Sequence, residues 1–227
     1  MIVLTGGTVY GLPNSTNTTP ENVCTPQRKD VVIAAGKILA MMDPSKTASF
    51  IDSIRHSELT ILPISVEDQL IIPGLIDVHV HAIGGGGEQG PYSRTPESRL
   101  SELIRGGLTT IVGVLGTDGV TRRSHPKYDS SSRLISYGMD LPDSTLRTIQ
   151  TLVLKYSWPV EEAIQFSTSN PATYLNLAGK GFLAEGYDAD IVVLNQTDLT
   201  PLYVIGKGQI LKTPTWIKRG MFELISE

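Results

Sequence analysis

The sequence predicts an α/β fold, because a strand–helix–strand unit occupies the middle of the chain and short strands lie at both ends. Residues 70–81 form an almost continuous apolar run ending in polar residues, which is typical of a strand buried on both faces of a parallel sheet. A helix within 95–105 and a strand at 109–115 follow, completing a βαβ unit. That unit is the repeat of either an α/β barrel or an open sheet.

Both ends of the chain are predicted to be β structure. At the amino end, short apolar runs lie within 1–10 and 30–42, separated by a stretch rich in Pro, Asn, Ser and Thr. At the carboxyl end, apolar runs separated by turns predict strands at 190–194, 201–205 and 208–211. Each end alone is too short to bury a core. We therefore expect residues 1–65 and 180–227 to pair as one small β-sandwich domain, with 66–179 as the other domain.

Helix boundaries are predicted from capping residues, prolines and glycines. The helix of the βαβ unit has a Thr-Pro-Glu start signal at 95–97 and a glycine pair at 106–107. A Pro-Asp-Ser start signal predicts a second helix over 142–156, and Pro159 predicts the start of a third that reaches Leu177.

Composition excludes several classes of partner. The chain of 227 residues is 40% hydrophobic and 19% charged, which is ordinary globular usage. A net charge of −4 without a run of Lys or Arg predicts no nucleic-acid and no membrane partner. With no basic leader and no apolar span of about 20 residues, we expect a cytoplasmic protein. The single cysteine excludes an internal disulfide.

His79 and His81 are the candidate metal ligands. The strand period of two directs both imidazoles to one side, and the end of the strand is where α/β folds place their active sites. Two neutral imidazoles on one face are half of a zinc site. The alternative is a pair of strand-end histidines hydrogen-bonded to carbonyl groups.

Two long segments in the same order resemble the amidohydrolase superfamily. The first is Ile72-Pro73-Gly74-Leu75-Ile76-Asp77-Val78-His79-Val80-His81, which resembles that family's first barrel strand. The second comprises residues 170–177 and 180–194, which look like its last helix and the return into a small β-sandwich. The resemblance implies that His79 and His81 bind the more buried metal of a metal-dependent hydrolase.

Residues 83–91 and 114–118 further resemble the β-aspartyl (isoaspartyl) dipeptidases. By that resemblance Glu88 receives the free amino group of the dipeptide, Thr117 hydrogen-bonds to the substrate, and Ser124 matches a substrate-binding serine. The alternatives are an exposed loop carboxylate for Glu88 and a turn-capping hydroxyl for Thr117.

The resemblance is incomplete in the centre of the chain. A complete (β/α)₈ barrel needs about 250 residues, whereas the 99 residues from His79 to Leu177 suffice for about three units. The expected fold is therefore an incomplete TIM-type (β/α) barrel plus the terminal β-sandwich, joined near residues 122–124. The family's bridging carboxylated lysine, its two further metal histidines and its catalytic aspartate have no counterpart here. His56 precedes the first barrel strand and His125 lies in no matching motif. Asp118 is a conceivable substitute ligand, but nothing in its spacing requires it, so we assign no catalytic residue.

The family binds two zinc ions per site, and we expect at most one, weakly held, in this chain. The function predicted from ancestry is the hydrolysis of β-aspartyl dipeptides, and the catalytic site of this chain is expected to be incomplete. One alternative is a non-catalytic truncated isoform or fragment that acts only by association. Another is a cyclic-amide hydrolase or deaminase of the same superfamily. The expected partner is a dipeptide substrate if the chain is active. Members of the family form homo-oligomers, but the loss of barrel surface makes them a poor guide to the assembly of this chain.

Overall fold

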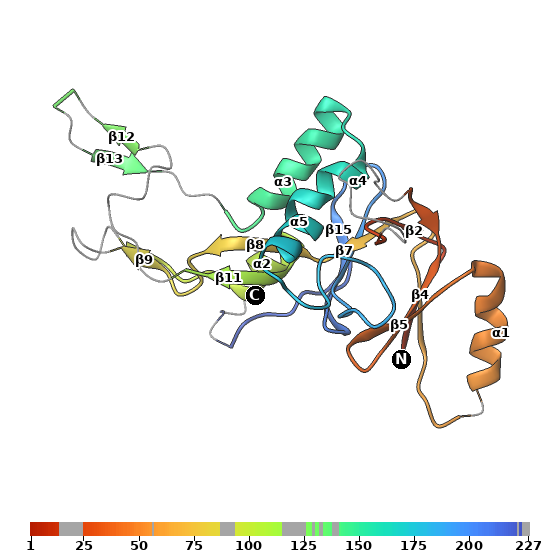
Figure 1. The fold of residues 1–227 in the computed structure, drawn as a ribbon. Helices are drawn as coiled ribbons and strands as arrows, with labels where there is room; N and C mark the ends of the chain where they lie inside the picture. Colours follow the sequence, from red (N-terminus) through yellow and green to blue (C-terminus); the bar gives the residue numbers. More distant parts are fainter. Residues whose placement is uncertain are drawn as a thin grey trace.

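The computed structural model describes residues 1–13, 25–55, 57–86, 94–114, 126–128, 130–131, 134–137, 141–221 and 223. These residues form a mixed α/β fold in three layers (Figure 1). A four-stranded sheet packs on one face of a six-stranded sheet, and helices with a two-stranded parallel sheet pack on the other face.

The four-stranded sheet is built from the amino end of the chain in the order β5-β4-β1-β6. Its strands are β1 (Ile2–Thr5), β4 (Asp30–Ala34), β5 (Lys37–Met42) and β6 (Leu62–Ser65). Helix α1 (Pro44–Ile54), which the sequence analysis did not predict, follows β5. Its start signal is present in the sequence, because Asp43 caps the Ser45 N–H and Pro44 occupies the first turn.

The six-stranded sheet combines both ends of the chain in the order β16-β15-β14-β7-β2-β3. Its strands are β2 (Thr8–Val9), β3 (Gln27–Arg28), β7 (Leu70–Pro73), β14 (Ile191–Leu194), β15 (Pro201–Gly206) and β16 (Gln209–Lys212). Strand β7 lies between β14, which runs antiparallel to it, and β2, which runs parallel. The carboxyl-terminal strands therefore complete a sheet that the amino-terminal half begins.

The six-stranded sheet is buried on both faces, and its residues alternate between two cores. In β14, Ile191 and Val193 pack with the four-stranded sheet, whereas Val192 and Leu194 pack with the helices. In β7, Ile71 packs in the core shared with the four-stranded sheet, whereas Leu70 and Ile72 pack in the core shared with the helices. This alternation follows from the strand period of two, and it explains why both strands are apolar throughout.

The apolar run 70–81 is two strands, so the prediction of a single strand buried on both faces is wrong. Strand β7 ends at Pro73, and β8 (Leu75–Val80) begins after Gly74 in a separate sheet. A Cβ atom on Gly74 would lie 2.6 Å from the Thr109 methyl carbon, so only glycine fits this crossing. In the described residues β8 pairs with β11 alone, which leaves Val78 45% exposed.

The predicted βαβ unit is present. Strand β8, helix α2 (Leu100–Arg105) and strand β11 (Leu108–Gly113) follow one another, and the two strands run parallel. Helix α2 begins later than predicted, because Thr95 belongs to β10 (Arg94–Thr95), which pairs with β9 (Gly85–Gly86). The helix ends at the glycine pair as expected, with Gly107 at a φ of +75°.

Two helical segments cover the far face of the six-stranded sheet. The first is α3 (Ser144–Gln150), which continues as a π-helical turn, η2 (Thr151–Lys155). The segment expected to be one helix over 159–177 comprises α4 (Val160–Ala163), a 3₁₀ turn η3 (Ile164–Ser167) and α5 (Ser169–Tyr174). The helical segment breaks at Thr168, because Pro171 has no N–H with which to continue the helical hydrogen bonds. Proline is tolerated in the first turn of a helix, so a new helix, α5, can begin just before it.

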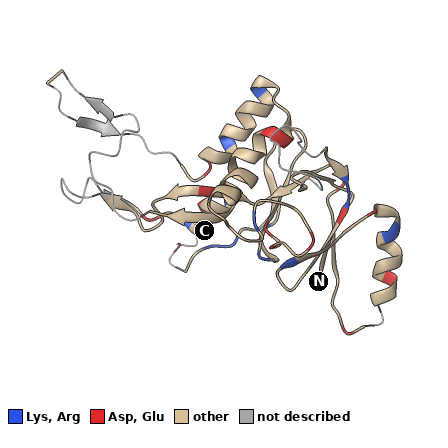
Figure 2. Cartoon of the chain, in the orientation of Figure 1, with Lys and Arg blue, Asp and Glu red and all other residues tan. Residues whose placement is uncertain are grey.

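A short hairpin, β12 (Pro126–Tyr128) with β13 (Leu134–Tyr137), lies apart from these layers (Figure 1). Acidic and basic residues are interspersed along the elements (Figure 2). Within the described ranges, no helix is long and apolar enough to cross a membrane. A sheet of two parallel strands is not a barrel, so the incomplete barrel remains a prediction.

An ion-pair network holds the segment before β14. The Lys180 ammonium donates to Asp188 at 3.0 Å and to Asp190, while Lys37 of β5 donates to Asp188 at 2.6 Å. Burial alone would lower the pKa of Lys180, but its hydrogen bonds to the two carboxylates raise it above the ordinary value. The Asp190 carboxylate also accepts the Lys207 N–H at 2.7 Å. The network therefore ties β5, β14 and the turn after β15 together.

Glu223 caps helix α2 from the distant end of the chain. Arg99, at the N-cap position, makes no side-chain capping bond. Instead, the Glu223 carboxylate accepts the Ser101 N–H at 3.0 Å and the Gly220 N–H at 2.9 Å. Burial alone would raise the pKa of Glu223, but hydrogen bonds from Ser101, Gly220 and Leu100 lower it from 4.5 to about 2. The carboxylate thus satisfies helix donors that have no partner within the helix.

Replacing Glu223 with Gln is expected to loosen this contact at neutral pH. Because the folded-state pKa is lowered, the ionised carboxylate contributes stability above pH 4.5, and that contribution is lost as the pH falls towards 2. Amide exchange at Ser101 should therefore be faster in Glu223→Gln than in the unmodified chain at pH 6. The two proteins should converge near pH 2. Equal exchange at pH 6 contradicts the capping role.

Candidate metal centre

His79 and His81 lie at the carboxyl end of β8, on the rim of the two-stranded parallel sheet. The sheet register pairs Leu75 with Leu108 and Val80 with Gly113, so both strands end on the same side. Helix α5 and the 3₁₀ turn η3 contact β8, and α3 contacts it as well. The βαβ unit thus holds the strand end from which the two imidazoles project.

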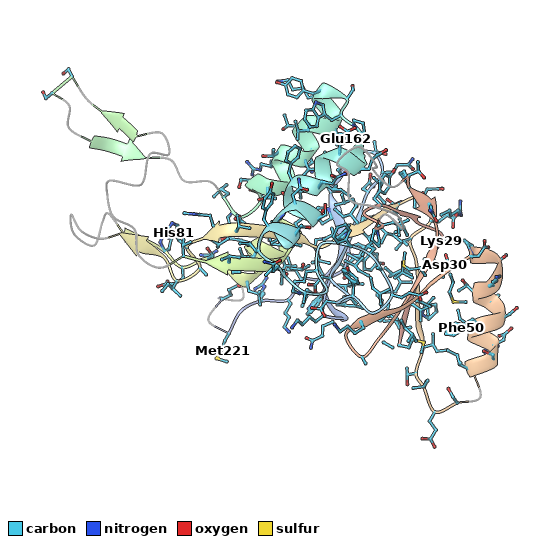
Figure 3. All side chains as sticks on the ribbon, viewed as in Figure 1. Lys29, Asp30, Phe50, His81, Glu162 and Met221 are labelled. Atoms are coloured by element: carbon cyan, nitrogen blue, oxygen red, sulfur yellow. The ribbon has the colours of Figure 1, made fainter. Side chains whose placement is uncertain are left out.

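The two imidazoles are neighbours. Their ring centres are 5.3 Å apart and their planes are inclined at 75°. His79 is exposed and His81 is half-buried, and Figure 3 shows His81 beyond the helices, near the end of β8. The Asp77 carboxylate accepts the His79 backbone N–H at 2.9 Å. Asp77, which lies on the same face of the strand as the two histidines, therefore holds the backbone at His79 in place.

The spacing of the two rings fits one bound zinc ion. Zinc lies about 2.0–2.1 Å from each coordinating imidazole nitrogen. With each ring centre about 1.1 Å behind its nitrogen and a tetrahedral angle of about 109°, two ring centres lie about 5.2 Å apart. The separation in this chain is 5.3 Å. The distance between the two rings is therefore compatible with two ligands of one tetrahedral ion.

The described residues do not complete that site. Among them, no group of three or more His, Cys, Asp or Glu side chains could hold a metal ion. The predicted substrate-binding residues Glu88, Thr117 and Ser124 lie outside the described residues, as do His56 and His125. Asp118 lies outside them too. The structure thus brings together only the two histidines of the predicted site.

Sequence reasoning did not assign a role to Asp77. Its signal was its position two residues before His79, because side chains at i and i+2 of a strand share a face. The structure uses its carboxylate as a backbone acceptor.

Residues 111–221 match the sequence profile of the amidohydrolase family. This match covers just under half of the chain, and it supports an amidohydrolase-family domain in that part. Members of this family generally bind metal ions, which agrees with the donor type and spacing of the histidine pair. The amidohydrolase resemblance noted from the sequence is therefore confirmed.

Comparisons with individual proteins agree with this family. A dihydroorotase from Desulforapulum autotrophicum is 30% identical over 94 residues, covering 41% of this chain and 20% of that protein. A dihydroorotase from Methanosphaera stadtmanae is 32% identical over 81 residues, covering 36% of this chain and 18% of that protein. The matches therefore span about a fifth of the length of these curated relatives.

The fold resembles a solved β-aspartyl dipeptidase from Fervidobacterium islandicum AW-1, in complex with β-Asp-Leu. The TM-score is 0.78 over 98% of each chain, with 18% sequence identity. At that identity the likeness shows a shared fold.

Proposed function

We propose that this chain is, by ancestry, a metal-dependent hydrolase of β-aspartyl (isoaspartyl) dipeptides whose catalytic site is incomplete. The observation that carries the proposal is the imidazole pair of His79 and His81, spaced for one metal ion at the end of β8. Support for the substrate class comes from the similarity in fold to a β-aspartyl dipeptidase and from the motif at residues 83–91.

The proposed organisation has two parts. Residues 66–179 form an incomplete TIM-type barrel, of which β8, α2 and β11 are one unit. Residues 1–65 with 180–227 form the β-sandwich, supported by the core shared between the four- and six-stranded sheets, and β7 of the intervening segment adds a strand to the six-stranded sheet. The proposed location is the cytoplasm, without nucleic-acid or membrane partners.

Each site residue has a proposed role. His79 and His81 hold zinc, which when bound lowers the pKa of a coordinated water towards neutrality. Glu88 pairs with the substrate ammonium, because a carboxylate and an ammonium form charge-assisted hydrogen bonds. Thr117 and Ser124 hydrogen-bond to the dipeptide.

The metal pair is tested by elemental analysis after loading with zinc and removing the excess. We expect no more than one zinc ion per chain, held weakly, because two imidazoles leave the coordination sphere incomplete. A chain carrying both His79→Ala and His81→Ala should retain none. Two tightly held zinc ions per chain would show that further ligands exist.

The dihydroorotase matches favour a second candidate, a cyclic-amide hydrolase or deaminase of the same superfamily. Turnover of dihydroorotate, or of other substrates without an α-amino group, would support it over the dipeptidase. The third candidate is a non-catalytic truncated isoform or fragment that acts by association. Sequencing the transcript across codons 120–126 tests this candidate, because a longer form would carry about 150 more residues if a complete barrel exists.

A further inference from the structure

Exposed aromatic side chains gather at the turn between η2 and α4. Tyr156 and Trp158 of this turn are 59% and 40% exposed, and Phe166 of η3 is 58% exposed. The ring centres of Trp158 and Phe166 lie 6.0 Å apart. Single exposed hydrophobic residues are ordinary, whereas a group of them marks an interaction site, and protein interfaces are enriched in Trp, Tyr and Phe. We call Tyr156, Trp158 and Phe166 the aromatic patch.

A hollow of about 270 Å³ opens beside the aromatic patch. It lies between α3 with η2 on one side and α4 with η3 on the other, and Phe166 lines it. The Trp158 backbone N–H donates to the carbonyl of Leu152, another lining residue, at 3.0 Å, so the turn borders the hollow. A cavity of about 150 Å³ accommodates benzene, so this hollow has room for an aromatic side chain.

The lining of the hollow suits an uncharged group. Its described side chains are apolar or neutral, and its hydroxyl groups belong to Ser144, Thr145, Thr148 and Ser167. A buried ion would need a charged or coordinating partner there, whereas an aromatic ring needs none. Protruding rings and a hollow that fits a ring therefore lie side by side on one face. A second copy of the chain offers the matching shape.

The charges around the turn are also self-complementary. Lys155 precedes the turn and Glu162 follows it, and both are exposed. Figure 2 shows basic residues on the helical segment 144–155 and acidic residues on α4, and Figure 3 labels Glu162 on the helical layer. Within the described residues neither Lys155 nor Glu162 forms an ion pair.

This charge order favours a second copy over a partner of one charge sign. A two-fold axis near Trp158 reverses the direction of the segment in the other copy. Lys155 of each copy then faces Glu162 of the other, on either side of the aromatic patch. Opposite charges at the rim of an interface steer association and fix its register.

We propose that two copies of this chain associate about a two-fold axis through the aromatic patch, with Trp158 of each copy entering the hollow of the other. The indole N–H is a donor only, and the hydroxyl groups of the hollow accept hydrogen bonds. The contact is closed, because each copy contributes one ring and one hollow. It does not rest on the proposed function, since neither the patch nor the hollow contains a candidate metal or substrate residue.

The test is sedimentation velocity of the full chain over a concentration series, with a chelator present. We expect the particle to change from one chain to two as the concentration rises. Trp158→Ala should weaken the association at least about tenfold, because a tryptophan anchored in a pocket is a typical hot spot. Phe166→Ala should act in the same direction. The matched control is Trp216→Ala, which removes a tryptophan that is 52% exposed beyond β16 and should leave the association unchanged.

Charge reversal tests the two-fold arrangement. Lys155→Glu and Glu162→Lys each set like charges opposite one another, so each should weaken the association. A chain with both substitutions should recover it, because every pair then has opposite charges again. Circular dichroism identifies any variant that fails to fold.

A second measurement leaves the patch intact. The chain has two tryptophans, so Trp216→Phe makes Trp158 the single tryptophan emitter. If Trp158 enters the hollow of another copy, its emission should shift to shorter wavelength as the protein concentration rises.

The outcomes separate this inference from the proposed function. A single chain per particle at every concentration overturns the inference, and so does doubling that persists in folded Trp158→Ala. Loss of the doubling in Trp216→Ala places the contact elsewhere and also overturns it. Failure of the double charge reversal to restore association overturns the two-fold arrangement. Doubling that requires zinc overturns the patch as the interface and leaves the metal pair standing, while the zinc content of the same fractions tests the metal pair by itself.

Discussion

The purified chain, supplied with zinc and β-Asp-Leu, is expected to release no more leucine than a control carrying His79→Ala and His81→Ala. Metal-dependent hydrolysis needs an open coordination position for water and a base that accepts its proton. General base catalysis alone typically contributes about 10²–10⁴-fold. The described residues offer two ligands, and no residue in the sequence matches the family's catalytic aspartate.

Association of two copies does not change this expectation. An identical chain brings the same histidines and the same missing groups. Leucine release near 1 s⁻¹, roughly the low end of ordinary enzyme rates, that disappears in the double variant would contradict the proposed incompleteness of the site.

Deletion of residues 190–227 is expected to unfold the amino-terminal strands. The deletion removes β14, β15 and β16, and with them Ile191, Val193 and Ile205 from the core shared with β4. Burial of each such side chain contributes about 1.5–3 kcal/mol. Their combined loss is comparable to the whole stability of a typical domain, about 5–15 kcal/mol.

The measurement is amide exchange at Val31, Val32 and Ile33 in the deleted chain. Exchange should become fast at all three positions, although none of them is removed. Truncation after Lys212 is the matched control, because it retains all strands of both sheets and should keep these amides protected. Equally slow exchange after the 190–227 deletion would mean that the four-stranded sheet is stable on its own.

Local patterns predicted the terminal strands and the βαβ unit well, because strand period and turn residues act over a few positions. They failed at Gly74, where the apolar run 70–81 divides between two sheets. An apolar run reports burial but not which sheet buries it. The constraint at Gly74 is its contact with Thr109, which lies in the next strand of the unit and is invisible to local sequence.

The part of the candidate site that could be predicted from the sequence is also the part that a local pattern reveals. His79 and His81 follow from alternation along one strand, and the structure places their rings 5.3 Å apart. Further ligands could not be inferred from spacing, because metal ligands usually come from different strands. The cap on α2 shows the same limit, since Glu223 reaches Ser101 from the opposite end of the chain.

The position of β7 has a consequence for how the protein is made. Strand β7 precedes the histidine-bearing strand directly, yet its antiparallel neighbour β14 is translated long after it. Strand β2 is made before β7 and can pair with one of its edges. Until Leu194 has left the ribosome, the other edge of this apolar strand stays open, and an open apolar edge is prone to aggregation. Pairing between such distant segments also closes slowly. Synthesis therefore leaves the strand end that carries His79 and His81 without its supporting sheet until the last part of the chain emerges.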